Sequence, residues 1–397
     1  MRKLSAHYIF TGTGTVLSKG IITLTDDGVI ADILDTKGAL EEMAGVEFYS
    51  GVITPGFVNA HCHLELSHLQ GIFPEKTGLP DFLKNVVEHR NINDGSVLDE
   101  ARKADISLWK NGVVAVGDIS NTNATFSLKS KSKIAYHTFI EALGFSPQRA
   151  EKAFSWAMSC YEEARQLGLS ASVVPHSPYA ISKELFDKIF GFAVSNRSVL
   201  SMHNQESRDE DDLYRSGKGE IFRHLTENLR IDLTSFHPSG KSALESVIGW
   251  LPKENKILLV HNIQTGQQDI DLIASARPLN QTWFVLCPES NLYIEGRLPD
   301  IGLFRKNKLQ ICLGTDSLSS NRQLSVLEEM KTVQGSFPAI PFGEIVTWAT
   351  RNGAQALEMD GWAGTIEKGK RPGINLITGM DMQHLLLQPQ SQVKRLM

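Results

Sequence analysis

The middle of the chain alternates between short apolar runs and longer segments in which apolar residues recur every three or four positions. Strand-length apolar runs occupy residues 56–61, 112–120, 134–142, 170–177, 198–204, 256–262, 282–290 and 309–317. Between them lie segments with helical spacing, such as residues 151–168, which close on Gly168. Apolar strands that alternate with helices are typical of a parallel sheet covered on both faces. Eight such units predict an α/β fold in which residues 56–350 form a closed (β/α)8 barrel.

The two ends of the chain have a different pattern, with short strands broken by turns. Residues 7–12, 15–25 and 29–34 are strand candidates, and the DDG at residues 26–28 is a hairpin signal. After residue 350 the stretch GTIEKGKRPGINLITG is typical of a turn, a strand and a second turn. We therefore expect residues 1–55 and 351–397 to pack together as a small β domain beside the barrel.

Composition and charge narrow the classes of protein to which this chain can belong. The 397 residues are 41% hydrophobic and 21% charged, as in soluble globular proteins. A formal net charge of -5 and the lack of a Lys/Arg-rich run argue against a nucleic-acid partner. No apolar run approaches the length of a signal-peptide core or a membrane span. We expect a cytoplasmic protein with no membrane partner.

The four cysteines, Cys62, Cys160, Cys287 and Cys312, are widely separated and show no C-x-x-C spacing. This pattern predicts neither a disulfide framework nor a structural zinc knuckle. We expect each thiol to fill space in a buried element, in a reducing compartment.

Residues with metal-binding and acid–base chemistry stand at the ends of the predicted strands. His61 and His63 end the first strand, and the later strands end in His176, His203, His261 and Asp316. In a (β/α)8 barrel the carboxyl ends of the strands meet at one face, so these side chains are expected to converge.

Strand alternation places His61 and His63 on one side and Cys62 on the other. With His203 and Asp316 they form a mixed nitrogen and oxygen set suited to Zn²⁺ or Fe²⁺, with one position left for water. We expect four other histidines at the surface, and two more are left open as possible neighbours of the site. The surface set is His7, His89, His224 and His384, and the open pair is His68 and His237.

A series of motifs in fixed order carries a family resemblance. The motifs are PGFVNAHCHLELS, HSPY, HNQES, LVHN, CPESNLYIEGRLPDI and LGTDSLSSN. Together they resemble the amidohydrolase superfamily, in particular its cytosine deaminase, guanine deaminase and chlorohydrolase-like branch. The resemblance covers nearly the whole chain and implies a barrel with a composite β-sandwich and a metal-dependent hydrolase activity.

The resemblance also implies a role for each motif residue. The metal ligands would be His61, His63, His203 and Asp316. Glu206 would be the proton shuttle, His261 would hold the hydrolytic water or the substrate, and His176 would face the substrate. Some relatives bridge two metals with a lysine at the end of strand 3 or 4. Because this chain has no lysine there, we expect one divalent metal, Zn²⁺ or Fe²⁺.

The chemistry of these groups is consistent with hydrolysis. A bound divalent ion lowers the pKa of water toward neutrality, Asp316 can accept the proton of that water, and Glu206 can protonate a ring nitrogen of the substrate. An alternative is that Glu206 is a solvated loop acid, because it begins the acidic run ESRDEDD. Its position after a ligand histidine favours the catalytic role.

Glu289 and Asn291, in the segment CPESN, are candidate substrate contacts. Many relatives carry an arginine or a small polar residue where this chain has Glu289. A carboxylate there could accept a hydrogen bond from an amino-bearing substrate, or it could be exposed. The identity of the substrate therefore cannot be taken from the resemblance.

We interpret the sequence as a hydrolytic deaminase that removes an exocyclic amine from a purine-like or other nitrogen heterocycle, nucleosides included, with water as the second substrate. One alternative is a cyclic amide hydrolase or a triazine-type chloro- or aminohydrolase, which would use the same activated water. An alternative from another class is a catalytically inactive metal- or nucleobase-binding protein. The sequence leaves open whether the chain is a homodimer.

Overall fold

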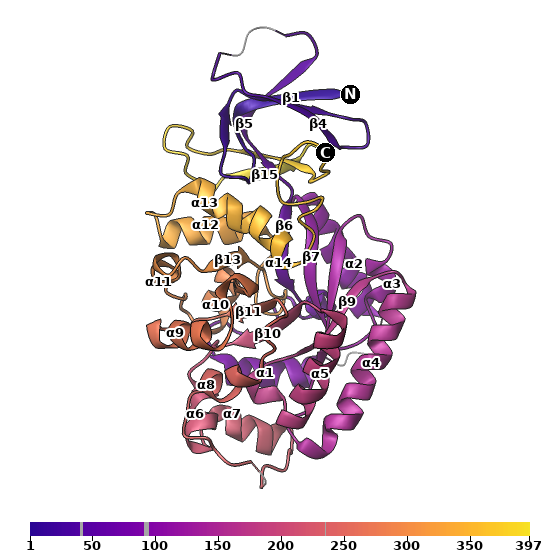
Figure 1. The fold of residues 1–397 in the computed structure, drawn as a ribbon, viewed down its shortest axis with the longest axis vertical. Coiled ribbons are helices and arrows are strands. Elements are labelled where there is room, and N and C mark those ends of the chain that lie inside the picture. Colours follow the sequence, from indigo (N-terminus) through magenta and orange to yellow (C-terminus); the bar gives the residue numbers. More distant parts are fainter. Residues whose placement is uncertain (40–42, 91–94, 235) are drawn as a thin grey trace.

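The fold is mixed α/β, with parallel strands in the middle of the chain and a β-rich unit made from its two ends (Figure 1). The computed structural model describes residues 1–39, 43–90, 95–234 and 236–397. Within these ranges no helix combines the length and the apolar character needed to cross a membrane.

The eight strands of the middle region form two parallel sheets of four. The first sheet runs β6 (Phe57–Cys62), β7 (Val113–Ser120), β8 (Ala135–Ala142), β9 (Ser170–Pro175), and the second runs β10 (Leu200–Asn204), β11 (Ile257–His261), β12 (Thr282–Leu286), β13 (Gln310–Leu313). Every residue of β6, β7, β10, β11 and β12 is buried. This burial explains the near-continuous apolar runs, since a parallel sheet is covered on both faces.

All eight predicted strand segments contain a strand, but two of them are shorter than expected. The segment 282–290 leaves the sheet at Leu286 because Pro288 begins a helix. The segment 309–317 leaves it at Leu313, and Asp316 then takes a left-handed backbone conformation with φ of 56°. Because both strands end early, the polar residues that follow them lie outside the strands, at the same edge of the second sheet.

Helices follow most of these strands and surround the sheets (Figure 1). The described helices are α1 (Leu79–His89), α2 (Ser96–Lys110), α3 (Phe126–Lys129), α4 (Ala150–Gln166), α5 (Lys183–Asn196), α6 (Asp209–Ser216), α7 (Glu220–Arg223), α8 (Ala243–Val247), α9 (Gln267–Ala276), α10 (Pro288–Ile294), α11 (Ile301–Lys306), α12 (Val326–Ser336), α13 (Phe342–Thr347) and α14 (Gly353–Ala356). The helix predicted at 151–168 is confirmed as α4, which buries Ala157, Cys160 and Ala164 on one face.

The two ends of the chain share one seven-stranded sheet. Its order is β15 (Gln392–Arg395), β14 (Ile374–Thr378), β5 (Val46–Pro55), β1 (Arg2–Phe10), β3 (Ile21–Leu24), β4 (Ile30–Leu34), with β2 (Val16–Ser18) paired to β1. The hairpin predicted at 26–28 is confirmed, since β3 and β4 pair antiparallel across it. Strand β5, which the short-strand pattern did not indicate, joins the ends by pairing with both β1 and β14.

This sheet has an apolar core of its own, separate from the main core. Its buried members are Leu4, Ala6, Ile9, Leu17, Ile22, Leu24, Ile30, Ile53, Ile366, Ile374 and Leu376. Both termini lie in this unit (Figure 1). A helical run from Trp348 to Ala356 crosses the boundary predicted at residue 350, because its apolar side chains pack against β6 and β13.

The four cysteines are free and buried, as predicted. Cys62 and Cys287 lie at or just beyond the ends of β6 and β12, and Cys312 lies within β13. All four belong to the main core, so packing accounts for them.

Candidate active site

Four side chains from three strand ends converge at the edge of the two parallel sheets. The Nε2 atom of His63 lies 3.2 Å from Nε2 of His61 and 3.3 Å from Nε2 of His203. The Oδ1 atom of Asp316 lies 3.5 Å from Nε2 of His63 and 3.7 Å from Nε2 of His61. All four residues are buried. The structure therefore brings together the four residues predicted as metal ligands.

The spacing of these atoms fits a divalent cation. A tetrahedral site with ligand distances of about 2.1 Å separates neighbouring ligand atoms by about 3.4 Å. The separations of Nε2 of His63 from the other two imidazoles, and of Oδ1 of Asp316 from His61 and His63, run from 3.2 to 3.7 Å. Three imidazole nitrogens and one carboxylate oxygen are also the donor types that Zn²⁺ and Fe²⁺ accept.

Hydrogen bonds outside the cluster orient its members. Nδ1 of His203 donates to the backbone carbonyl of His176 at 2.9 Å, which turns Nε2 toward the other candidate ligands. Oδ2 of Asp316 accepts from the hydroxyls of Ser290 at 2.7 Å and Ser320 at 2.6 Å. The other carboxylate oxygen of Asp316 is left to face the three imidazoles.

The corner that carries Asp316 is built around a glycine. A Cβ atom at Gly314 would lie 2.8 Å from Cβ of His61, so only glycine permits this approach. The next two backbone N–H groups, of Thr315 and Asp316, both donate to the carbonyl of His61, at 3.0 and 3.1 Å. These contacts hold His61 and Asp316, which are distant in sequence, next to each other.

Four residues other than glycine have left-handed backbone conformations at this edge of the sheets. Gln205, His261, Asn262 and Asp316 have φ values of 49°, 74°, 58° and 56°. Residues other than glycine pay on the order of 1–3 kcal/mol for such conformations, and they cluster at functional sites. The surrounding hydrogen bonds, including those of Gln205 to the Thr265 hydroxyl and the Gln264 backbone N–H, hold the chain in this state.

Glu206 is buried beside the ligand cluster, so the alternative of a solvated loop acid is wrong. Burial raises the pKa of its carboxyl well above the usual range; His203 opposes this effect, and Asp316 and Glu210 add to it. The loop is held by Glu210, whose carboxylate accepts from the Glu206 backbone N–H at 2.7 Å. A carboxyl whose pKa is raised retains its proton more readily and can donate it.

His261 is a neutral hydrogen-bond acceptor at the same place. Its Nδ1 donates to Oδ1 of Asn291 at 2.8 Å, which leaves the proton off Nε2. Nε2 is buried, has no hydrogen-bond partner among the described residues, and lies 3.7 Å from Oε1 of Glu206. Burial lowers the pKa of His261 to about 3, although Asp316 opposes the shift.

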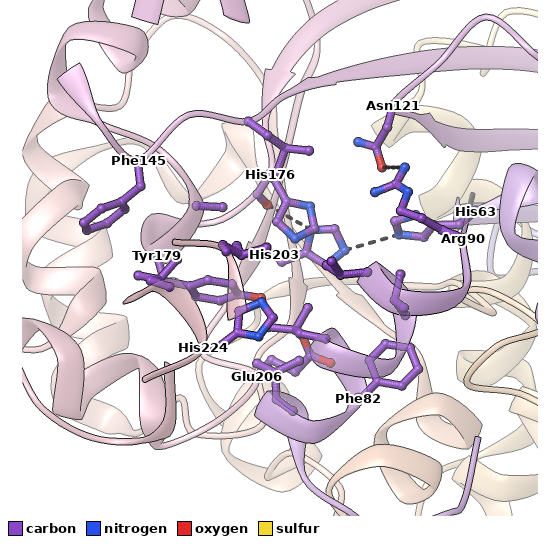
Figure 2. Close-up of a pocket in the computed structure, with 18 of the residues that line it drawn as sticks. His63, Phe82, Arg90, Asn121, Phe145, His176, Tyr179, His203, Glu206 and His224 are labelled. Atoms are coloured by element: carbon purple, nitrogen blue, oxygen red, sulfur yellow. Dashed lines mark hydrogen bonds between the residues drawn. The ribbon is translucent and has the colours of Figure 1, made fainter. Parts of the chain in front are cut away.

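Glu141, on β8, is a site residue that the sequence analysis missed. Its Oε2 accepts from Nδ1 of His176 at 2.8 Å and from Nδ2 of Asn121 at 3.0 Å. Asn121 in turn accepts from Arg90 at 3.0 Å (Figure 2). The available signal was a glutamate near the end of the third strand of the middle region.

We predict that Glu141→Gln lowers kcat/KM by about tenfold, because a neutral amide replaces the charge-assisted acceptor that orients His176. Steady-state kinetics together with metal analysis would measure the effect. Metal content should stay at the wild-type level, since Glu141 is not a proposed ligand. Unchanged kinetics would show that the bond between Glu141 and His176 does not serve the reaction.

A buried ion pair supports the segment that follows His63. Nζ of Lys129 lies 2.9 Å from Oδ2 of Asp118, and both side chains are fully buried. Oδ1 of Asp118 accepts from the backbone N–H of Leu64 at 2.8 Å. The pair therefore anchors the chain immediately after a candidate ligand.

Lys129→Met should lower the free energy of unfolding by about 3–5 kcal/mol, because it leaves the Asp118 carboxylate buried without its partner. Urea denaturation would measure the change. In the double variant Lys129→Met/Asp118→Asn the uncompensated charge is removed, so part of the stability should return. A single variant as stable as the wild type would contradict this account.

The candidate ligands face a cavity of about 550 Å³. Of the residues predicted for the site, it is lined by His63, His176, His203, Glu206, His261 and Asp316 (Figure 2). His61 lies beneath them, fully buried. Most of the remaining wall is apolar and comes from α1 and from residues 143–145 and 225–231.

Two sequence predictions for substrate contacts do not match this lining. Glu289 lines a separate small cavity, because α10 turns its side chain toward Thr332 of α12 and away from the ligand cluster. Asn291 does not line the large cavity either. It accepts a hydrogen bond from His261 and so orients a residue that does line the cavity.

The other histidines divide differently from the prediction. His224 was expected at the surface, but it is buried in the wall of the large cavity because a π-helical turn, His224–Asn228, directs it inward. His89 and His384 are exposed, and His7 is half-buried. His68 and His237 do not line the large cavity.

Comparison with known proteins agrees with this geometry. The chain is 27% identical over 340 residues to an adenosine deaminase of Helicobacter pylori, covering 83% of this chain and 79% of that one. It is 28% identical over 341 residues to an aminodeoxyfutalosine deaminase of Nitratiruptor, with the same coverage. The solved structure of Helicobacter pylori aminofutalosine deaminase in complex with methylthio-coformycin matches all of both chains with a TM-score of 0.81 at 24% identity. The model of the Amidohydrolase family matches residues 52–395. The chain therefore belongs to the amidohydrolase family.

Proposed function

We propose that this protein is a metal-dependent hydrolytic deaminase that removes the exocyclic amine of a purine nucleoside. The observation that carries the proposal is the juxtaposition, in one cavity, of a buried proton donor at Glu206 with a donor set that fits a divalent cation. A binding protein needs no protonated acid at such a place, whereas the departure of an amine does.

The roles of the side chains follow from their positions. One divalent cation held by His61, His63, His203 and Asp316 would supply a nucleophile from water at neutral pH. Asp316 would accept the proton that this water loses, because its carboxylate faces the ligand cluster and is held there by Ser290 and Ser320. Glu206 would deliver its proton to the ring nitrogen next to the carbon under attack.

His261 would accept a hydrogen bond from the attacking water through its free Nε2 atom. Its low pKa keeps it neutral, so it does not compete with Glu206 as the proton donor. His176, which follows β9, would face the heterocycle, and Glu141 would orient its ring. We propose zinc as the cation, because imidazole nitrogens and a carboxylate oxygen are donors that zinc takes, and zinc can expand its coordination beyond four ligands to admit water.

The choice of a purine nucleoside rests on the cavity and on the relatives. The cavity volume of about 550 Å³ lies in the range of pockets that enclose a ligand larger than a free base. One curated relative is named for adenosine, and it covers 83% of this chain.

We also propose an architecture in which residues 56–350, together with the helical run that ends at Ala356, form a closed (β/α)8 barrel, and residues 1–55 and the remainder of the C-terminal segment form a composite β-sandwich. Hydrogen bonds at both free edges of the parallel sheets support closure. The N–H of His203 donates to the carbonyl of His176 at 2.9 Å, and the N–H groups of Thr315 and Asp316 donate to His61. The separate apolar core of the terminal strands supports a second domain.

Ammonia release from a panel of compounds would test the function. The purified, zinc-loaded protein would be incubated with adenine, guanine, cytosine, adenosine, 5′-deoxyadenosine and a chlorotriazine. We expect ammonia from the adenine nucleosides. Release of chloride from the triazine without ammonia from any amine would instead assign the alternative chlorohydrolase chemistry, and no turnover of any compound would contradict the proposal.

A further inference from the structure

His224 is a buried polar residue in the cavity wall for which the proposed reaction gives no role. It is the first residue of the π-helical turn His224–Asn228, which follows α7, and only 6% of its surface is exposed. Its ring lines the same cavity as Glu206, Tyr179 and Phe82 (Figure 2). A histidine in this position needs a hydrogen-bond partner or a ligand.

The hydrogen bonding of the ring fixes where its proton lies. Nδ2 of Asn228 donates to Nδ1 of His224 at 3.2 Å, so the proton of the neutral ring lies on Nε2. Burial lowers the pKa of His224, which keeps the ring neutral. No residue that the structure describes accepts a hydrogen bond from Nε2. The cavity wall therefore presents one N–H donor that no protein group satisfies.

The surroundings of His224 are apolar. The turn packs against α1, and the wall on this side is formed by Leu79, Phe82 and Val86 of α1 together with Leu225 and Leu229. A donor without a protein acceptor in such a place favours a ligand that supplies an acceptor atom. One directed donor in an apolar wall is the arrangement that orients a bound ligand.

His224 stands on a different part of the cavity wall from the candidate ligands. It follows α6 and α7 and its turn packs against α1, whereas the candidate ligands, which form the charged end of the cavity, stand at the ends of β6, β10 and β13. The groups that act on the amine and on the ring nitrogen all lie at that charged end. A substrate held there would reach His224 only with the part that extends beyond the base.

We propose that His224 is a specificity-determining residue whose Nε2–H donates a hydrogen bond to an acceptor atom on the substituent carried by the base, that is, on the sugar or on a group attached to it. The inference rests on the proposed function. It implies that the enzyme distinguishes a substituted nucleoside from the free base through this one donor, while the apolar wall accepts the rest of the substituent.

The test compares adenine with adenosine and 5′-deoxyadenosine in zinc-loaded variants. His224→Leu removes the donor, and His224→Gln restores an N–H at similar reach. For the leucine variant we expect kcat/KM for the nucleosides to fall about 5- to 30-fold, mainly through KM. The value for adenine should stay within twofold of wild type, and the glutamine variant should recover part of the loss. For a compound that is bound but not turned over, its competitive inhibition constant replaces kcat/KM.

Two further variants make the result specific. Asn228→Ala leaves His224 in place but removes the group that fixes its tautomer, so it should produce a smaller loss confined to the nucleosides. His237→Leu, an exposed histidine outside the large cavity, is the matched control and should behave as wild type. Equal losses for adenine and the nucleosides, or no recovery with glutamine, would overturn the role of His224. Absence of ammonia from every compound with the wild-type protein would defeat the proposed function instead, and the inhibition or binding constants of adenine and adenosine would still decide the role of His224.

Discussion

Glu206→Gln should lower the turnover number for deamination by about 10²–10⁴-fold, the usual contribution of general acid–base catalysis. Glutamine keeps the size and the hydrogen-bonding reach of the side chain but cannot deliver a proton. The effect is expected to be large because the carboxyl is buried, and burial raises its pKa, which favours the protonated form that donates. Ammonia release under saturating substrate would measure the change.

The metal content of Glu206→Gln should remain at the wild-type level, because Glu206 is not one of the four side chains whose donor atoms converge. Glu289→Gln offers a matched control, since it makes the same chemical change outside the large cavity. We expect that control to keep full activity. A Glu206→Gln enzyme with nearly wild-type turnover would point to a hydrolase that needs no ring protonation. Loss of the metal would make Glu206 a support of the ligand cluster.

Asp316→Ala and His203→Ala should each abolish both metal binding and catalysis, with a loss of at least about 10⁴-fold. The reason is that water has a pKa of about 15.7 in bulk and of about 7 at a catalytic zinc site, so without the cation almost no nucleophile exists at neutral pH. Each variant removes one of the four converging donors. Elemental analysis of the purified variants and ammonia release would be measured on the same preparations.

Chelation of the wild-type protein provides the reversible counterpart of these substitutions. Activity should be lost on removal of the metal and should return on addition of Zn²⁺ or Fe²⁺, and the better of the two identifies the preferred ion. One equivalent of metal per chain is expected, because the three groups of possible metal ligands that the structure describes share His61 or His203 and therefore adjoin one another. Two equivalents, or full activity in the chelated protein, would contradict the proposed site.

The secondary structure of the middle region could be predicted because burial on both faces of a parallel strand leaves a continuous apolar run. The eight runs all contain a strand, and the segment 151–168 is a helix with small residues on its buried face. The limits of the elements were less predictable. The segment 282–290 ends early because Pro288 starts a helix, and the run from Trp348 to Ala356 remains helical because it packs against strands far away in sequence.

The convergence of the four candidate ligands was also predictable in outline. Strand alternation puts His61 and His63 on one side, and parallel strands bring the ends of β10 and β13 to the same edge. The pattern could not predict the contacts that bring these side chains together. These contacts depend on the close approach at Gly314 and on the left-handed conformation of Asp316, which are properties of packed neighbours.

The surroundings of three residues were determined by the tertiary structure and could not be predicted from the sequence. Glu141 contacts His176 only because β8 and β9 place the two side by side, and His224 lines the cavity only because a π-helical turn rotates it inward. Glu289 lies outside the large cavity because α10 turns it toward Thr332 of α12. The sequence by itself determined the parallel α/β framework and the donor atoms at its strand ends, since periodicity and residue type are local properties. Only the tertiary structure decided which further polar groups face the cavity, because that depends on how each helix is rotated and on neighbours that are distant along the chain.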